Sequence, residues 1–83
     1  MTPPRRITIL YFGLLAERRG LSEELLETNA ATPAELFSEL AARHPLGIST
    51  TGLKVAVNDE FVPWDHSLNE GDITAFLPPM SGG

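Results

Sequence analysis

The sequence predicts one α+β domain over residues 1–83, with a mixed sheet of about five strands packed on one main helix and a short helix after the first strand. Three observations carry this prediction. A β-branched and aromatic segment comes first, a helix with a clear N-terminal signal occupies the middle, and three short extended segments follow it. A chain of 83 residues has room for a single small core.

The first strand is predicted at residues 7–12, which are β-branched and aromatic and end at Gly13. Apolar residues at both parities favour a central position in the sheet. Residues 14–19 fit a short helix that stops at Gly20. Residues 23–28 are ambiguous, because ELLE favours a helix by propensity while a short strand paired with the first strand fits equally well.

The main helix has the clearest local signal, Thr32-Pro33-Ala34-Glu35. Thr32 can cap the first free amides, Glu35 can reach back, and Pro33 stands where its missing N–H costs nothing. The helix is expected to continue to about His44 and to end before Pro45. Its predicted apolar stripe consists of Leu36, Phe37, Leu40 and Ala41.

The remaining extended segments are predicted to complete the sheet. Residues 53–57 form a strand that turns at residues 58–60 into Phe61-Val62 as a hairpin. Residues 73–77 form the last strand, which ends at Pro78 because proline cannot donate to a sheet ladder. The first and last strands are the most apolar, so they are expected to lie side by side in a β-grasp-like roll.

Alternation along the last strand predicts an exposed apolar surface. If Phe76 packs against the helix, Ile73 and Leu77 point outward. In the same register Ile7, Ile9 and Tyr11 pack inward, and Phe12 points outward from the end of the first strand. Phe61 and Trp64 lie near the end of the hairpin. An exposed apolar patch on a small acidic domain is typical of a partner surface.

Composition excludes several functions. The chain has no cysteine, which rules out disulfides, zinc-thiolate sites and a cysteine nucleophile. Its net charge is −5 and its six basic residues are dispersed, which argues against nucleic acid binding. No apolar run approaches the roughly 20 residues of a membrane span. The start lacks the apolar stretch of a secretory signal, so we expect a cytoplasmic protein without a membrane partner.

No catalytic or metal-binding constellation is expected. His44 and His66 are the only histidines, and they are too far apart in sequence to indicate a metal site. Asp65, His66 and Ser67 are adjacent, whereas catalytic triads converge from separate elements. No glycine-rich phosphate loop precedes a helix.

The segment LPPMSGG, residues 77–83, is the remaining candidate. Pro78-Pro79 would end the strand and project residues 78–83 as a stiff tail. Met80 to Gly83 can reach at most about 13–14 Å. Gly82 and Gly83 have no Cβ and could pass through a narrow channel, bringing the α-carboxylate of Gly83 to its far end. A carboxylate can be adenylated, thiolated or amidated.

These residues resemble the ubiquitin-like β-grasp sulfur carriers, in particular the small-subunit family of molybdopterin synthase. The resemblance covers nearly the whole chain. Two departures are Thr74, where an aliphatic residue is usual, and Ser67, where proline is usual. The matching positions are Val57-Asn58, Asp65-His66, Leu68, Gly71-Asp72, Phe76, Pro78-Pro79 and Gly82-Gly83.

The resemblance implies a carrier that is not an enzyme on its own. A ubiquitin-activating-like adenylyltransferase would use ATP to adenylate Gly83, and a sulfur donor would convert it to a thiocarboxylate. The loaded tail would then give sulfur to cyclic pyranopterin monophosphate in molybdenum cofactor biosynthesis. No cofactor would be bound stably by the carrier itself.

The resemblance also implies partners. The large synthase subunit would form a heterotetramer of two small and two large subunits. Gly82 would let the tail pass into the pocket of that subunit. The implied partner-binding residues are Phe12, Phe61, Leu77, Pro78, Pro79, Met80 and Ser81.

Two alternatives stay open. The chain can be a carrier for thiazole, cysteine or tRNA thiolation, or a ubiquitin-like protein modifier. It can also be a plain interaction module whose tail is inert.

Overall fold

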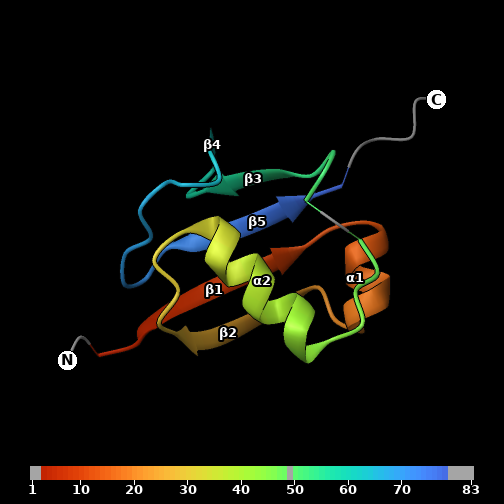
Figure 1. The fold of residues 1–83 in the computed structure, drawn as a ribbon, viewed down its shortest axis with the longest axis horizontal. Coiled ribbons are helices and arrows are strands. Elements are labelled where there is room, and N and C mark those ends of the chain that lie inside the picture. The colour runs from red at the N-terminus through yellow and green to blue at the C-terminus, as the bar shows by residue number, and fades with distance from the viewer. Residues whose placement is uncertain (1–2, 49, 79–83) are drawn as a thin grey trace.

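The structure is a computed structural model that describes residues 3–48 and 50–78. Five strands form one mixed sheet in the order β2-β1-β5-β3-β4. Figure 1 shows α2 lying across one face of the sheet, and α1 at the end toward which β1 and β5 point. The elements are β1 (Arg5–Tyr11), α1 (Leu14–Arg19), β2 (Glu23–Thr28), α2 (Pro33–Arg43), β3 (Lys54–Val57), β4 (Glu60–Val62) and β5 (Ile73–Leu77).

This architecture confirms the predicted α+β class and the central first strand. β5 pairs in parallel with β1, from Thr8 opposite Ile73 to Tyr11 opposite Phe76. Parallel neighbours end at the same edge of a sheet, so the chain leaves β5 beside the turn that follows β1. The predicted tail lies mostly beyond this point, and residues 79–83 are outside the described residues.

The ambiguous segment at residues 23–28 is a strand. It pairs antiparallel with β1 over six residues, from Arg5 opposite Thr28 to Leu10 opposite Glu23. Local helix propensity in ELLE is worth only a few tenths of a kcal/mol per residue, roughly. A continuous ladder with β1 outweighs it, because strand preference depends on the neighbouring surface.

The start of α2 matches its sequence signal. The Thr32 side chain accepts a hydrogen bond from the Glu35 N–H at 3.2 Å, and the Glu35 carboxylate accepts one from the Ala31 N–H at 2.9 Å. The predicted inclusion of Ala41 in the apolar stripe is wrong, because Ala41 is exposed. The buried stripe instead runs from Pro33 through Leu36, Phe37 and Leu40.

Asn58 and Asp72 tie the β3–β4 hairpin to β5. Asn58 and Asp59 have φ of 51° and 72°, as a two-residue hairpin turn requires. The Asn58 side chain accepts from the Ile73 N–H and donates to the Asp72 carboxylate, both at 3.0 Å. The other Asp72 oxygen accepts from the Asn69 N–H at 2.8 Å. These motif positions therefore build the fold.

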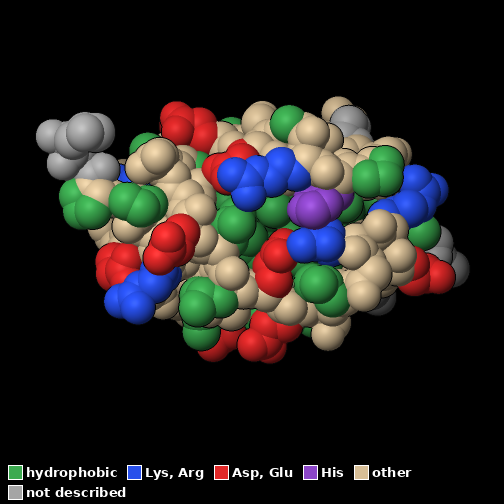
Figure 2. Space-filling model, turned by 90° about the horizontal axis from the view of Figure 1, so that it is seen from below, with side chains coloured by type: hydrophobic (Ala, Val, Ile, Leu, Met, Phe, Trp, Pro, Cys, Tyr) green, Lys and Arg blue, Asp and Glu red, His purple; other side chains and the backbone are tan. Residues whose placement is uncertain are grey.

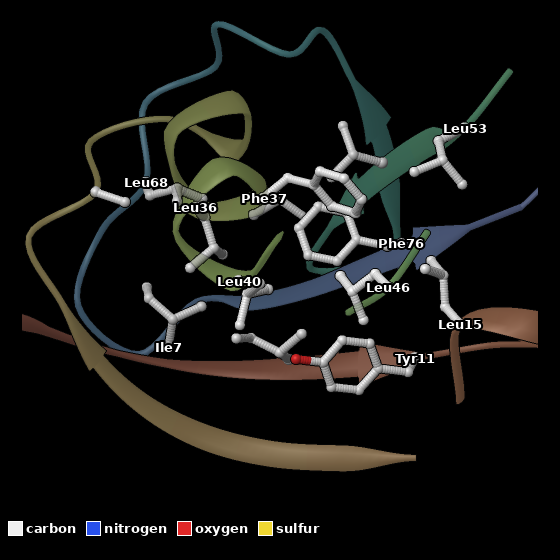
Figure 3. Close-up of a cluster of buried hydrophobic side chains, with 14 residues drawn as sticks. Ile7, Tyr11, Leu15, Leu36, Phe37, Leu40, Leu46, Leu53, Leu68 and Phe76 are labelled. Atoms are coloured by element: carbon white, nitrogen blue, oxygen red, sulfur yellow. The ribbon is translucent and has the colours of Figure 1, made fainter. Parts of the chain in front are cut away.

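Aromatic packing fills the space between α2 and β5. Figure 3 shows Phe37 and Phe76 facing each other at the centre of the buried cluster. Their ring centroids are 5.2 Å apart with the planes at 69°, and Trp64 stacks on Phe76 at 5.9 Å. The fully buried Phe76 side chain is thus held by residues from two other parts of the chain.

Thr74 is the one residue whose buried side-chain polar atom lacks a hydrogen-bond partner among the described residues. A buried hydroxyl without a partner costs about 1–3 kcal/mol. We therefore expect Thr74→Val to raise the free energy of unfolding by about 1 kcal/mol, measured by urea denaturation followed by circular dichroism. Thr8→Val, on the half-buried opposite face, is the matched control. A stability loss in Thr74→Val would contradict this account.

Candidate functional site

The two faces of the sheet have different exposures. In β1, Ile7, Ile9 and Tyr11 are buried toward α2, as predicted from alternation. In β5, Phe76 is buried while Leu77 is half-buried and turned to the other side. The sheet therefore has an outer face that no helix covers in the part of the chain that the structure describes.

Cross-strand register shows which outer side chains are neighbours, because directly paired residues point to the same face. Leu77 pairs with Lys54 and Ala75 pairs with Ala56. Ala56 also pairs with Phe61 on the edge strand β4. We call this surface the outer sheet face; it consists of Leu10, Phe12, Lys54, Ala56, Phe61, Ile73, Ala75 and Leu77.

The turn after β1 packs against the base of the tail. Gly13 has φ of +57°, in the region that favours glycine. A Cβ placed on Gly13 would lie 3.3 Å from Cγ of Pro78. The end of β5 and the Phe12–Gly13 turn thus make one continuous surface at this end of the sheet.

The structure brings three predicted site residues onto that surface. Phe61 is 70% exposed and Phe12 is 44% exposed, while Leu77 is half-buried between them in the strand order. Trp64 packs into the core instead of joining the patch. Of the predicted tail residues only Pro78 is described, and the other five, Pro79, Met80, Ser81, Gly82 and Gly83, lie outside the described residues.

Sequence reasoning placed Ile73 correctly on the outer side but missed one exposed apolar residue of the sheet, Leu25. Leu25 is 66% exposed and lies opposite Thr8, which in turn lies opposite Ile73, 44% exposed. The row extends the apolar surface across β2, away from the tail. Alternation in β2 would have revealed Leu25, but only once residues 23–28 had been assigned to a strand.

A shallow groove of about 270 Å³ borders the outer sheet face at the edge strand. It is lined by residues at the start of β3, in β4 and just after β4, including Lys54, Phe61 and Trp64. The Lys54 ammonium lies 5.7 Å from the centroid of the Phe61 ring. The groove therefore combines aromatic surface with one positive charge beside Leu77.

A polar cluster anchors α1, which stands at the same end of the sheet as the tail base (Figure 1). The Tyr11 hydroxyl donates to the Glu24 carboxylate at 2.5 Å, and Arg19 donates to both Glu24 oxygens at 3.1 and 2.7 Å. Burial, and then the hydrogen bond to Glu24, raise the pKa of Tyr11 above its ordinary value of 10. Burial opposes ionisation of Glu24, but hydrogen bonds from Arg19 and Tyr11 hold its pKa below its ordinary value.

These shifts predict the pH limits of the fold. Because the Tyr11 pKa is raised on folding, its contribution to stability is complete below about pH 10 and is lost as pH rises through the folded value. Because the Glu24 pKa is lowered on folding, its contribution to stability is complete above about pH 4.3. That contribution is lost as pH falls through the folded pKa of Glu24.

Tyr11 is the only tyrosine, so absorbance of the phenolate reports on it alone. We expect native Tyr11 to ionise well above pH 10, and Glu24→Gln to bring its pKa partly back, since burial remains. Circular dichroism recorded in parallel separates ionisation from unfolding, and urea-unfolded chain gives the reference. An ordinary titration near pH 10 in the folded protein would contradict the cluster.

Charge is mixed over the visible surface. Figure 2 shows acidic and basic side chains interspersed on the face seen from below, without a large block of basic ones. No group of three or more His, Asp or Glu side chains within residues 3–48 and 50–78 is arranged to hold a metal ion. Neither helix in those ranges is long and apolar enough to cross a membrane.

A protein-family model and several curated proteins match nearly the whole of this sequence. The model of the ThiS family matches residues 9–83. The molybdopterin synthase sulfur carrier subunit of Chlamydomonas reinhardtii is 37% identical over 82 residues, covering 94% of this chain and 99% of that protein. The protein of that name from Escherichia coli is 34% identical over 80 residues, covering 93% and 99%.

Solved structures agree on the fold. SAMP1 from Haloferax volcanii is 25% identical, with a TM-score of 0.79 over 94% of this chain and 99% of that one. A chain of the BexX/CysO complex from Amycolatopsis orientalis is also 25% identical, with a TM-score of 0.70 over 93% and 99%. The chain therefore belongs to the ThiS family of ubiquitin-like sulfur carriers, and it is related over nearly its whole length to molybdopterin synthase sulfur carrier subunits.

Proposed function

We propose that this protein is the sulfur carrier subunit of molybdopterin synthase and that Gly83 carries the sulfur as a thiocarboxylate. The observation that carries the proposal is the near full-length relationship to curated sulfur carrier subunits of that synthase, at 34–37% identity in two of them. The Gly82-Gly83 pair stands within the region matched by the family model.

The proposed cycle activates and then uses one carboxyl group. The Gly83 carboxylate attacks ATP held by an adenylyltransferase, which forms an acyl-adenylate and releases pyrophosphate. Sulfur at the oxidation level of sulfide, supplied by a donor, attacks the acyl-adenylate, displaces AMP and leaves the thiocarboxylate. The thiocarboxylate gives its sulfur to cyclic pyranopterin monophosphate, and hydrolysis restores the carboxylate. Splitting one difficult substitution into an activation and a transfer lowers each barrier.

The fold suits a carrier that is not an enzyme on its own. Parallel pairing of β1 with β5 directs the chain out of the sheet at Pro78, beside Gly13 in the turn that follows β1. A partner that covers the outer sheet face would therefore receive the tail at the same time. The apolar side chains there would contribute about 25 cal/mol for each Å² that docking removes from water.

The proposed partners are the large synthase subunit and the adenylyltransferase. The two curated relatives are named as subunits of a synthase, and the BexX/CysO structure is a complex. We propose a heterotetramer of two small and two large subunits, with residues Phe12, Phe61, Leu77 and those of the tail at the contact. ATP would belong to the activating partner, and no cofactor would stay on the carrier.

Intact mass of the chain isolated from its own cells tests the proposal. Exchange of one oxygen for one sulfur at the Gly83 carboxyl is the expected result, and alkylation of the thiocarboxylate gives a second signature. An unmodified chain after incubation with the adenylyltransferase, ATP and a sulfur donor would overturn the carrier function and favour an interaction module with an inert tail.

A second candidate is a carrier for another thiolation pathway or a protein modifier. It is favoured by the likeness to SAMP1 and to a chain of the BexX/CysO complex, neither named for molybdopterin. Transfer of sulfur from the loaded chain to cyclic pyranopterin monophosphate, in the presence of the large synthase subunit, supports the first candidate. Isopeptide conjugates of Gly83 with cellular proteins, without such transfer, support the second.

A further inference from the structure

We propose that Lys54 is the residue through which the outer sheet face recognises a carboxylate of its docking partner. The inference rests on the proposed function, because it takes the large synthase subunit as that partner. It goes further by assigning a charge contact within an otherwise apolar surface, and by stating the chemistry that the partner must present.

Lys54 differs from every other basic residue of the chain. It is the only lysine, and its ammonium makes no ion pair or hydrogen bond with the rest of the described chain. Each arginine, by contrast, is engaged by an acceptor of its own chain. The pairs are Arg5 with the Ala30 carbonyl, Arg6 with Glu70, Arg18 with the Leu46 carbonyl, Arg19 with Glu24 and Arg43 with Glu39.

The position of Lys54 means that a docking partner must cover its ammonium group. The residue is exposed and pairs across strands with Leu77, the last residue of β5 before the tail begins. Its ammonium is held near the exposed Phe61 ring, 5.7 Å from the ring centroid. A partner that covers Leu77 and Phe61 therefore also covers the ammonium and removes much of its water.

An ammonium that loses water needs an acceptor. Burying an isolated charge is costly unless it is paired and hydrogen-bonded. The Phe61 ring offers its π face but no lone pair, so the remaining N–H donors of Lys54 would stay unsatisfied. A carboxylate on the partner supplies both acceptor and opposite charge. It also orients docking, since one positive charge within an apolar face defines one register.

The charge balance of the chain sharpens this requirement. With a net charge of −5, the protein repels acidic surfaces at long range. Lys54 places one positive charge beside Leu77, so an acidic residue of a partner is attracted there and repelled elsewhere on the surface. This arrangement selects a partner surface that is apolar, carries one carboxylate opposite Lys54, and is basic at its rim.

The test is calorimetric titration of the purified large synthase subunit with full-length chain, in about 0.15 M salt. We expect Lys54→Glu to weaken binding by roughly 10- to 100-fold and Lys54→Arg to stay within about threefold. Arg43→Glu, on α2, makes the same change of two charges away from the outer sheet face. It is expected to stay within about threefold, which separates a local contact from net charge.

A second measurement locates the contact. Single Asp or Glu to Lys changes in the large subunit should include one that restores binding to Lys54→Glu. Equal binding by wild type and Lys54→Glu would overturn the role of Lys54 while leaving the proposed function intact. Equal weakening by Arg43→Glu would overturn it as well. Absence of wild-type binding would instead overturn the proposed function, and with it this inference.

Discussion

A chain that lacks Gly83 is expected to lose sulfur transfer entirely while keeping its fold. Removing one residue draws the reactive carboxyl back by about 3.5 Å, and a misplacement of 1 Å at a reacting centre can cost about 100-fold in rate. The described sheet ends at Leu77 and the buried cluster ends at Phe76, so neither depends on Gly83. Thiocarboxylate formation and product synthesis give the activity, and circular dichroism gives the fold.

Chains lengthened at either end provide the matched controls for the deletion of Gly83. Two residues added after Gly83 replace the free carboxyl by a peptide bond and should abolish activity in the same way. The same two residues placed before Met1 should have no effect, because β1 starts at the end of the sheet opposite to that at which β5 finishes. Normal activity of the C-terminally extended chain would refute the assignment of Gly83.

Phe76→Ala is expected to have the largest effect on stability. Truncating a fully buried phenylalanine costs about 3–5 kcal/mol, because transfer energy is lost and a cavity remains. Phe76 also contacts the rings of Phe37 and Trp64. A domain of 83 residues is stable by only about 4–12 kcal/mol in total, so this variant should lose a large fraction of its free energy of unfolding. Urea denaturation followed by circular dichroism measures the loss.

Phe61→Ala is the control for Phe76→Ala, since the same truncation is made at a side chain that is 70% exposed. Its free energy of unfolding should change by no more than about 0.5 kcal/mol. Binding to the large subunit should weaken, because Phe61 lies on the outer sheet face. A Phe61→Ala variant that is as unstable as Phe76→Ala would show that the assignment of the two faces is incorrect.

The strongest local signals in the sequence predicted the elements well. The Thr32-Pro33-Ala34-Glu35 signal gave the start of α2, because capping is settled within four residues. The stop at Gly20 and the turn at Asn58-Asp59 depend on backbone conformations that few other residues adopt readily. The apolar first and last strands were correctly placed together, since each needs neighbours on both edges and cover on a face.

Long-range pairing was less predictable. The ELLE segment became β2 because β1 offered an unpaired edge, a fact that lies outside the segment itself. Ala41 fits the helical period but is exposed. The period gives the direction in which each side chain of the helix points, but it does not show how far the sheet extends beneath the helix. Thr74 was noticed as a departure from an aliphatic pattern, but only the structure shows that its hydroxyl is buried without a partner.

Some features of the candidate site were likewise predictable from the sequence, and others were not. The sequence by itself determined every element except β2, the outward direction of Phe12 and Leu77, and the Gly82-Gly83 motif of a sulfur carrier, because alternation and motifs are local properties of the chain. Only the tertiary structure decided that Lys54 stands beside Leu77 and near Phe61, and that every arginine is already engaged. Such neighbours are set by strand order and register, which arise from contacts between segments distant in sequence.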